Sequence, residues 1–144
     1  MNTIPTIEEV QSFIEEGLVI KKNQFYGKSE REIETIITKQ LREQYGDVNI
    51  HRQYSVGGFL SLKCDIDLFD SKCCGIELKL AKKLSNSGSK ERLIGQAIYY
   101  SKRCYQNKLI VLVVGTKKEY DTSLKEVQQF LKELGVHFMY KEIE

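Results

Sequence analysis

Hydrophobic residues recur every three to four positions in four segments of the chain, which is the spacing of an amphipathic helix. Pro5 precedes the first segment, and Glu8 and Glu9 fall in its first turn, as is typical of a helix start. Ser29 and Glu32 have the spacing of a capping box at the start of the second segment. We therefore expect four helices, over about residues 6–16, 30–45, 90–105 and 122–134.

The pattern changes to a period of two in the middle of the chain, which predicts strands. A first strand, about 48–56, leads into a turn at Gly57 and Gly58, and a turn at 70–72 joins the next two strands. In the second strand, one face is expected to carry Leu60, Leu62, Cys64, Ile66 and Leu68, and the other Lys63, Asp65 and Asp67. In the third, residues 73–81, Glu77 and Lys79 are expected to face away from Ile76, Leu78 and Leu80.

Residues 109–115 are apolar throughout, which predicts a central strand buried on both faces. A short last strand is expected over 136–140. The resulting order is helix, helix, strand, strand, strand, helix, strand, helix, strand. It predicts the α/β class, bordering on α+β, with helices flanking a mixed central sheet. The length of 144 residues fits a single domain over 1–144.

Charge is unevenly distributed, although 22 Lys and Arg against 20 Asp and Glu leave a net charge of only +2. The charged side chains before Lys21 are all acidic, whereas Glu91 is the one acidic residue between Lys79 and Lys108. The total excludes a uniformly basic, histone-like chain, and 41% hydrophobic residues argue against disorder.

No apolar run is long enough to cross a bilayer and no signal peptide is visible, so we expect a cytoplasmic protein without a membrane partner.

The four cysteines are expected to be free thiols in strands and core, because nothing indicates secretion and a chain of this length needs no disulfides. A disulfide from Cys64 to Cys73 or to Cys74 across the hairpin stays open as an alternative. The fourth cysteine, Cys104, follows the third helix pattern. Because no CxxC pair occurs, a zinc or redox protein built on the cysteines is a weaker alternative.

Charged side chains are predicted to gather on the second and third strands. A tight hairpin would place Asp67 opposite Glu77, or Asp65 diagonal to it, with Lys79 beside them. Adjacent carboxylates repel each other, and a divalent cation such as Mg²⁺ or Mn²⁺ removes the repulsion because it prefers carboxylate oxygens. The alternative is a solvated sheet face with ordinary cross-strand ion pairs.

The string CDIDLFDSKCCGIELK, residues 64–79, resembles the motif of the PD-(D/E)XK nuclease superfamily. In that superfamily an Asp begins the second core strand and E-x-K lies on the third. The matching residues here are Asp65, Glu77 and Lys79, with Cys64 in place of the proline.

The order of predicted elements over about residues 28–115 also resembles the restriction-endonuclease-like αβββαβ core of that superfamily. The first helix and the last helix and strand would be additions to this core. The branches that the chain resembles are the RecB-like and the Holliday-junction-resolvase-like ones.

The resemblance implies a role for each matching residue. Asp65 and Glu77 would ligate Mg²⁺ or Mn²⁺, with the Leu78 backbone carbonyl as a further ligand and Asp67 as an alternate. Lys79 would orient or deprotonate the attacking water and stabilise developing negative charge.

Two predicted helices carry further matches. Glu30, with Glu34 as an alternate, resembles the glutamate found on the helix before the sheet, which would bind a second metal or hold a water. Gln96 and Tyr100 resemble the QxxxY element of RecB-like branches: Gln96 would orient the active-site network, and Tyr100 would support its helix or contact nucleic acid. The alternative is that Glu30 and Glu34 are ordinary solvated helix charges. For Gln96 and Tyr100, the alternative is helix polarity and a core aromatic.

The basic stretch after Lys79 suits a phosphate backbone, and its alternative is a solvated lysine-rich surface. The residues expected to bind nucleic acid, besides Tyr100, are Lys82, Lys83, Lys90 and Arg92.

Together these features predict a Mg²⁺-dependent deoxyribonuclease that cuts within DNA and works as a homodimer, because a chain this small spans little of a duplex. The alternative is a non-catalytic nucleic-acid-binding or assembly module that retains the nuclease-like fold.

Overall fold

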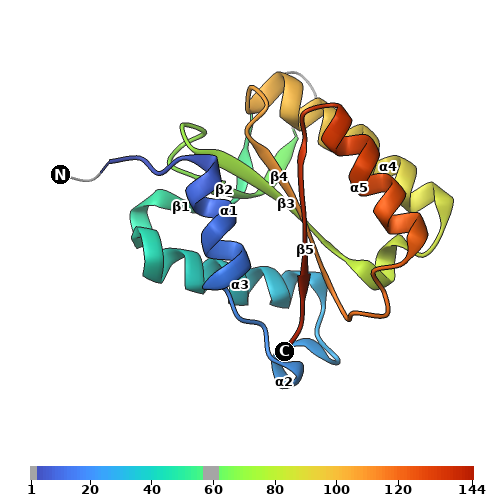
Figure 1. The fold of residues 1–144 in the computed structure, drawn as a ribbon. Coiled ribbons are helices and arrows are strands. Elements are labelled where there is room, and N and C mark those ends of the chain that lie inside the picture. Colours follow the sequence, from blue (N-terminus) through green and yellow to red (C-terminus); the bar gives the residue numbers. More distant parts are fainter. Residues whose placement is uncertain (1–2, 57–61) are drawn as a thin grey trace.

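The computed structural model describes residues 3–56 and 62–144 (Figure 1). The turn expected at Gly57 and Gly58 lies outside the described residues, as does Leu60. The helices are α1 (Ile7–Glu16), α2 (Lys22–Phe25), α3 (Glu30–Tyr45), α4 (Ser87–Tyr99) and α5 (Thr122–Glu133). The strands are β1 (Ile50–Ser55), β2 (Lys63–Leu68), β3 (Cys74–Leu80), β4 (Leu109–Gly115) and β5 (His137–Glu142).

The described strands form one mixed sheet in the order β1-β2-β3-β4-β5. Neighbouring strands from β1 to β3 are antiparallel, whereas β3, β4 and β5 are parallel. The α/β class, the mixed sheet and the order of the main elements are therefore confirmed. The two edges of the sheet are β1 and β5.

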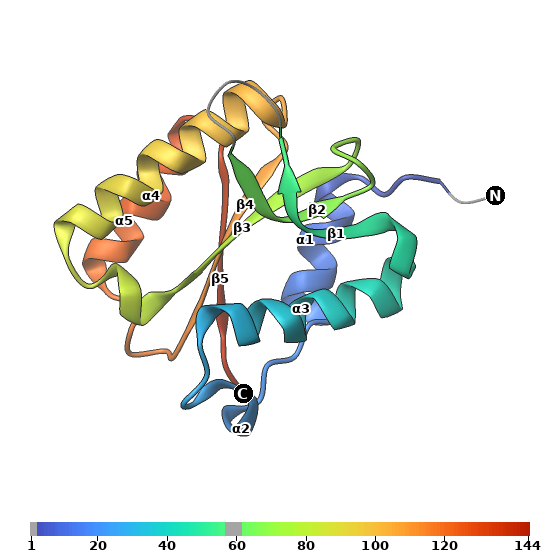
Figure 2. The ribbon, with the colours of Figure 1, turned by 180° about the vertical axis from the view of Figure 1, so that it is seen from behind.

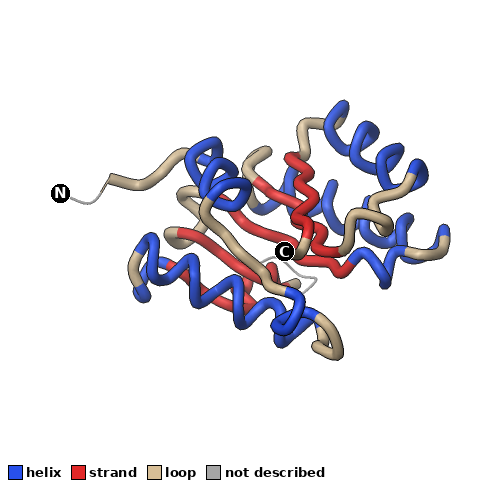
Figure 3. The backbone as a smooth tube through the Cα atoms, turned by 60° about the horizontal axis from the view of Figure 1, so that its bottom comes forward, coloured by secondary structure: helices blue, strands red, loops and turns tan. Residues whose placement is uncertain are grey.

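Helices cover both faces of the sheet, with α1 and α3 on one side and α4 and α5 on the other (Figures 1 to 3). The central strand β4 contributes to both cores because its side chains alternate between the two faces. Ile110, Leu112 and Val114 pack towards α1 and α3, and Leu109 and Val111 towards α4 and α5. The continuous apolar run is thus a strand buried on both faces, as predicted.

The alternation predicted for β2 breaks in the middle of the strand. Cys64 belongs to the core under α4 and α5, whereas Ile66 and Leu68 belong to the core under α1 and α3. Gln53 of β1 and Asp65 of β2 face each other without forming a pair, although the residues on both sides of them are paired. Gln53 has a φ of 49°. A residue in this left-handed region kinks its own strand, so the break in β2 lies opposite a kink in β1. The prediction of one shared face for Cys64, Ile66 and Leu68 was therefore wrong.

The third predicted helix, expected over about residues 90–105, has different boundaries in the structure. α4 begins at Ser87, not near Lys90, because the Asn86 side chain accepts a hydrogen bond from the Ser89 N–H at 2.8 Å and caps the helix. A 3-10 helix over Ala81–Leu84 precedes it, and the π-helical turn Tyr100–Cys104 ends it. Further short elements that the sequence pattern missed are α2 and the 3-10 helix Asp47–Asn49.

All four cysteines are free thiols, and Cys64, Cys73 and Cys74 are buried. The disulfide alternatives are thus absent from this structure. Within residues 3–56 and 62–144, no helix has both the length and the apolar character needed to cross a bilayer.

Candidate active site

The candidate site lies where β2 and β3 separate. Their ladder pairs Ile66 with Ile76 and continues towards the hairpin turn, but no pair joins the strands on the other side of Ile66. The N–H groups of Leu78 and Leu80 therefore point at the gap without a strand partner. Each is satisfied by a carboxylate instead, because buried N–H groups need an acceptor.

Asp65 and Glu30 supply these two acceptors. The Asp65 carboxylate accepts from the Leu78 N–H at 2.8 Å, and the Glu30 carboxylate on α3 accepts from the Leu80 N–H at 3.1 Å. The C=O of a strand residue points the same way as its N–H, so the Leu78 carbonyl faces the same gap. The separation of the strands thus gathers two carboxylates and one carbonyl around β3.

Glu77 is buried beside this gap, with 3% of its surface exposed. Burial first, then a hydrogen bond with Asp65 and the negative charges of Asp65 and Glu30, together raise the pKa of Glu77 to about 9, although the charge of Lys79 lowers it. Lys79 is two residues along β3 and partly exposed. The site therefore holds more carboxylate than one lysine neutralises.

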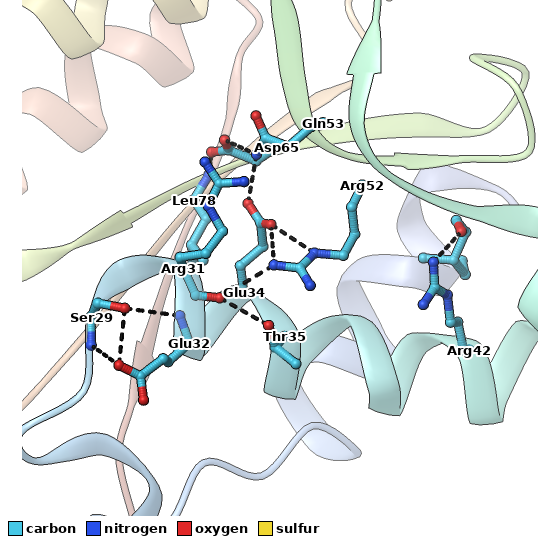
Figure 4. Close-up of polar contacts among 11 residues, drawn as sticks. Ser29, Arg31, Glu32, Glu34, Thr35, Arg42, Arg52, Gln53, Asp65 and Leu78 are labelled. Carbon is cyan, nitrogen blue, oxygen red and sulfur yellow. Dashed lines mark hydrogen bonds and ion pairs between the residues drawn. The ribbon is translucent and has the colours of Figure 1, made fainter.

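A second glutamate of α3 is tied to the same gap through β1 (Figure 4). Glu34 is 3% exposed; it accepts from the Arg52 side chain at 2.8 Å and from the Gln53 amide at 2.9 Å. The Gln53 amide also donates to Asp65 at 3.2 Å. Because both Glu34 oxygens are already bonded, Glu34 serves to hold Gln53 and Asp65, and Glu30 is the helix carboxylate left facing the cavity.

Arg52 and Gln53 were not among the residues singled out from the sequence. Their strand, HRQYS, reads as ordinary polar alternation, and no sequence signal marks Gln53 as the left-handed residue that turns towards Asp65.

A cavity of about 490 Å³ opens beside Glu30 and Lys79. It is lined by the basic side chains of Lys83 and Arg92 and by the amide of Gln96. The 3-10 helix and α4 place these three residues, which the sequence spreads over 14 positions between 83 and 96. A cavity with basic walls and a carboxylate at its edge can accept a phosphate group.

The remaining predicted residues lie elsewhere. Tyr100 is 4% exposed and its hydroxyl donates to the Lys63 carbonyl at 3.1 Å, so it anchors α4 to β2 and is too buried to contact nucleic acid. Lys82 and Lys90 do not line the cavity beside Lys79. Of the wider basic stretch, Lys108 donates to the Lys72 carbonyl beside the hairpin turn.

Asp67 is paired with Gly75 in the sheet, not with Glu77 as predicted. One of its oxygens accepts from the Tyr105 hydroxyl at 2.8 Å and from the Ser71 N–H at 2.9 Å. The two-residue offset arises because the hairpin turn ends at Cys73, which sets the register of the whole ladder. Asp67 therefore does not take the place of Asp65 beside Glu77.

The carboxylate and carbonyl oxygens at the gap are ligands that a hard divalent cation prefers, but their spacing matches a metal site only in part. Two carboxylates share buried space, and a cation would remove the repulsion that raises the pKa of Glu77. In the described part of the chain, however, the one group of three ligating side chains whose ligand atoms lie within 4.8 Å of one another is His51, Asp67 and Asp70. A cation at the gap would thus rest on Asp65, Glu77 and the Leu78 carbonyl, while Glu30 stays bonded to the Leu80 N–H at the edge of the cavity.

Replacing Arg52 by alanine is expected to destabilise the fold, because the buried Glu34 carboxylate loses its ion-pair partner at 2.6 Å. Arg52 is 28% exposed, so we expect roughly 2–3 kcal/mol, below the range for a fully buried pair. Urea unfolding measures the loss, with exposed Arg103→Ala as the matched control. Adding Glu34→Gln to Arg52→Ala should recover part of the lost stability. A double variant less stable than Arg52→Ala alone would contradict the role of Arg52 as the ion-pair partner of Glu34.

Comparisons of the chain with models of protein families, with curated proteins and with solved structures found no match. The assignment of a function therefore rests on the geometry described above.

Proposed function

We propose that this protein is a metal-dependent nuclease that hydrolyses phosphodiester bonds in DNA, with a restriction-endonuclease-like core of the PD-(D/E)XK type. The observation that carries the proposal is the gap between β2 and β3. Asp65, Glu77 and Lys79 meet there, and Glu30 borders the same cavity as Lys79.

Each residue of the gap has a role in the proposed reaction. Asp65, Glu77 and the Leu78 carbonyl would hold Mg²⁺ or Mn²⁺, which offsets the negative charge of the scissile phosphate and of the leaving oxygen. The Lys79 amine would orient the attacking water and stabilise charge that develops on the phosphate. Glu30 would accept a hydrogen bond from that water, and Gln96 would fix the orientation of the phosphate.

The basic side chains beside the gap would bind the DNA backbone. Lys83 and Arg92 share the cavity with Lys79. We propose that Lys82 and Lys90 extend this contact along the strand, and that a homodimer presents two such sites to a duplex. Affinity for DNA should then fall steeply with salt, because each neutralised phosphate releases counterions.

A non-catalytic nucleic-acid-binding module is the second candidate. It is favoured by one observation: the Asp65 and Glu30 carboxylates already accept hydrogen bonds from β3, as groups with a purely structural role would. This candidate predicts DNA binding without cleavage and no change in melting temperature when Mn²⁺ is added.

A digestion panel tests the proposal. Single-stranded, duplex, flapped and four-way-junction DNA are incubated with the protein in Mg²⁺, in Mn²⁺ and in EDTA. Cleavage of at least one form is expected with either metal and none in EDTA. Activity that persists in EDTA, or no cleavage of any form together with no rise in melting temperature on adding Mn²⁺, would contradict the proposed nuclease.

A further inference from the structure

A second group of potential metal ligands lies at the hairpin end of β2. His51 of β1, Asp67 of β2 and Asp70 of the following turn each offer one ligand atom, and these atoms lie within 4.8 Å of one another. His51 and Asp67 are directly paired across the two strands, which explains how they come together. None of the three residues takes part in the gap around Asp65 and Glu77.

Asp67 has an oxygen without a partner. Its side chain is buried, with 0% of its surface exposed. Oδ1 is held by the Tyr105 hydroxyl and the Ser71 N–H, whereas Oδ2 is buried and makes no hydrogen bond. A buried carboxylate oxygen without a donor is costly, and this one is left free in a group that can ligate a cation.

His51 offers a ring nitrogen beside this oxygen. Its Nε2 atom is buried and meets no hydrogen-bond geometry, and its neighbour is Asp70 Oδ1 at 3.1 Å, an ion-pair distance when the ring is protonated. A neutral imidazole nitrogen with a free lone pair is a preferred ligand of transition metals. The Tyr54 ring stacks on the imidazole with centroids 5.6 Å apart and limits its rotation.

The surrounding contacts orient the ligands. Tyr105 and Ser71 fix the Asp67 carboxylate from behind, as outer-shell partners do in metal sites. Asp70 is 66% exposed, so an ion can enter from solvent on its side. Phe69, Asp70 and Ser71 have φ values of 63°, 53° and 67°, and this left-handed turn brings Asp70 back over His51.

We propose that His51, Asp67 and Asp70 form a binding site for Zn²⁺. One imidazole nitrogen and two carboxylate oxygens suit Zn²⁺, whereas Mg²⁺ and Ca²⁺ prefer oxygen ligands throughout. Three protein ligands leave one tetrahedral position for solvent. The bound ion would join the edge strand β1 to the β2–β3 turn. The site is independent of the proposed nuclease activity.

Titration of the metal-free protein tests this site. Zn²⁺, Mg²⁺ and Ca²⁺ are each added to the full chain, and binding is followed by calorimetry and by melting temperature. One equivalent of Zn²⁺ should bind at this site and raise the melting temperature, while Mg²⁺ and Ca²⁺ should not compete with it. His51→Gln or Asp70→Asn should weaken Zn²⁺ binding at least about tenfold. Asn is chosen because it tolerates the left-handed backbone of Asp70.

Controls separate this site from the other candidate ligands. Exposed Asp47→Asn should leave Zn²⁺ binding unchanged, and so should Glu77→Gln, which removes a ligand of the proposed nuclease site. Co²⁺ in place of Zn²⁺ should show no thiolate charge-transfer band, because Cys73 and Cys74 are not ligands. The proposal is overturned by the absence of Zn²⁺ binding, by binding that survives both His51→Gln and Asp70→Asn, or by a thiolate band.

Discussion

Glu77→Gln and Lys79→Ala are each expected to reduce the rate of DNA cleavage by about 10²–10³-fold or more, the loss typical of removing one group that stabilises charge in a transition state. Glu77→Gln removes a carboxylate that is proposed to ligate the metal next to Asp65, and Lys79→Ala removes an amine that lies near Glu77 and lines the cavity. Single-turnover rates on the best substrate of the digestion panel measure both effects.

Two exposed residues on α3 provide the matched controls, since Glu43→Gln and Lys39→Ala change the same charges away from the gap. Both should cleave at the wild-type rate. The Glu77→Gln protein should also lose the rise in melting temperature that Mn²⁺ gives the wild type, while Lys79→Ala should keep it. Robust cleavage by both site variants would reject the assignment of the active site.

The stability of the metal-free protein is expected to fall as pH rises, and Glu77 is the reason. Its pKa is about 9 in the folded protein, mainly through burial, against 4.5 for an ordinary Glu. Below pH 4.5 both states are protonated, and the contribution of Glu77 is fully present. Between pH 4.5 and 9 the folded state keeps a proton that the unfolded chain has released, so stability is lost. At 1.36 kcal/mol per pKa unit, the loss over this window is roughly 3–6 kcal/mol.

Glu77→Gln tests this dependence because the amide is uncharged at every pH. Free energies of unfolding in urea, with a chelator present, should fall less between pH 5 and 9 in Glu77→Gln than in wild type or in Glu43→Gln. At pH 8 the Glu77→Gln protein should be more stable than wild type although it is expected to cleave DNA much more slowly, a trade-off typical of active sites. Parallel pH curves would show that Glu77 is not held protonated.

Much of the fold could be predicted from the sequence where periodicity is strong. The capping box at Ser29 and Glu32 fixed the start of α3, and the apolar run 109–115 identified β4 as an interior strand buried on both faces. The prediction was poor where one residue breaks the period. Cys64 and Ile66 look like two residues on one face of a strand, yet they lie in opposite cores, and the left-handed Gln53 of β1 lies opposite the break between them.

The same contrast holds for the candidate site. The spacing of Glu77 and Lys79 on one strand placed both on one face, since strand alternation is local. The partner of Glu77 across the sheet depended on the register, which the hairpin turn sets, and the prediction of Asp67 opposite Glu77 failed there. No local sequence pattern indicated that Glu30 would accept a hydrogen bond from the Leu80 N–H, 50 positions away. The same is true of the hydrogen bond from Arg52 to Glu34.

The sequence by itself determined the class of the fold, the order of its elements and the group of residues around 65–79 that form the proposed site, because these depend on spacing along the chain. The tertiary structure alone decided which of those residues lie together at the gap and which lie at the hairpin end of β2. It separated β2 from β3, so that Asp65 turned to Glu77 while Asp67 turned to His51 and Asp70. The physical reason is that unpaired backbone groups and buried carboxylates must find partners, and only packing in three dimensions decides which partners are within reach.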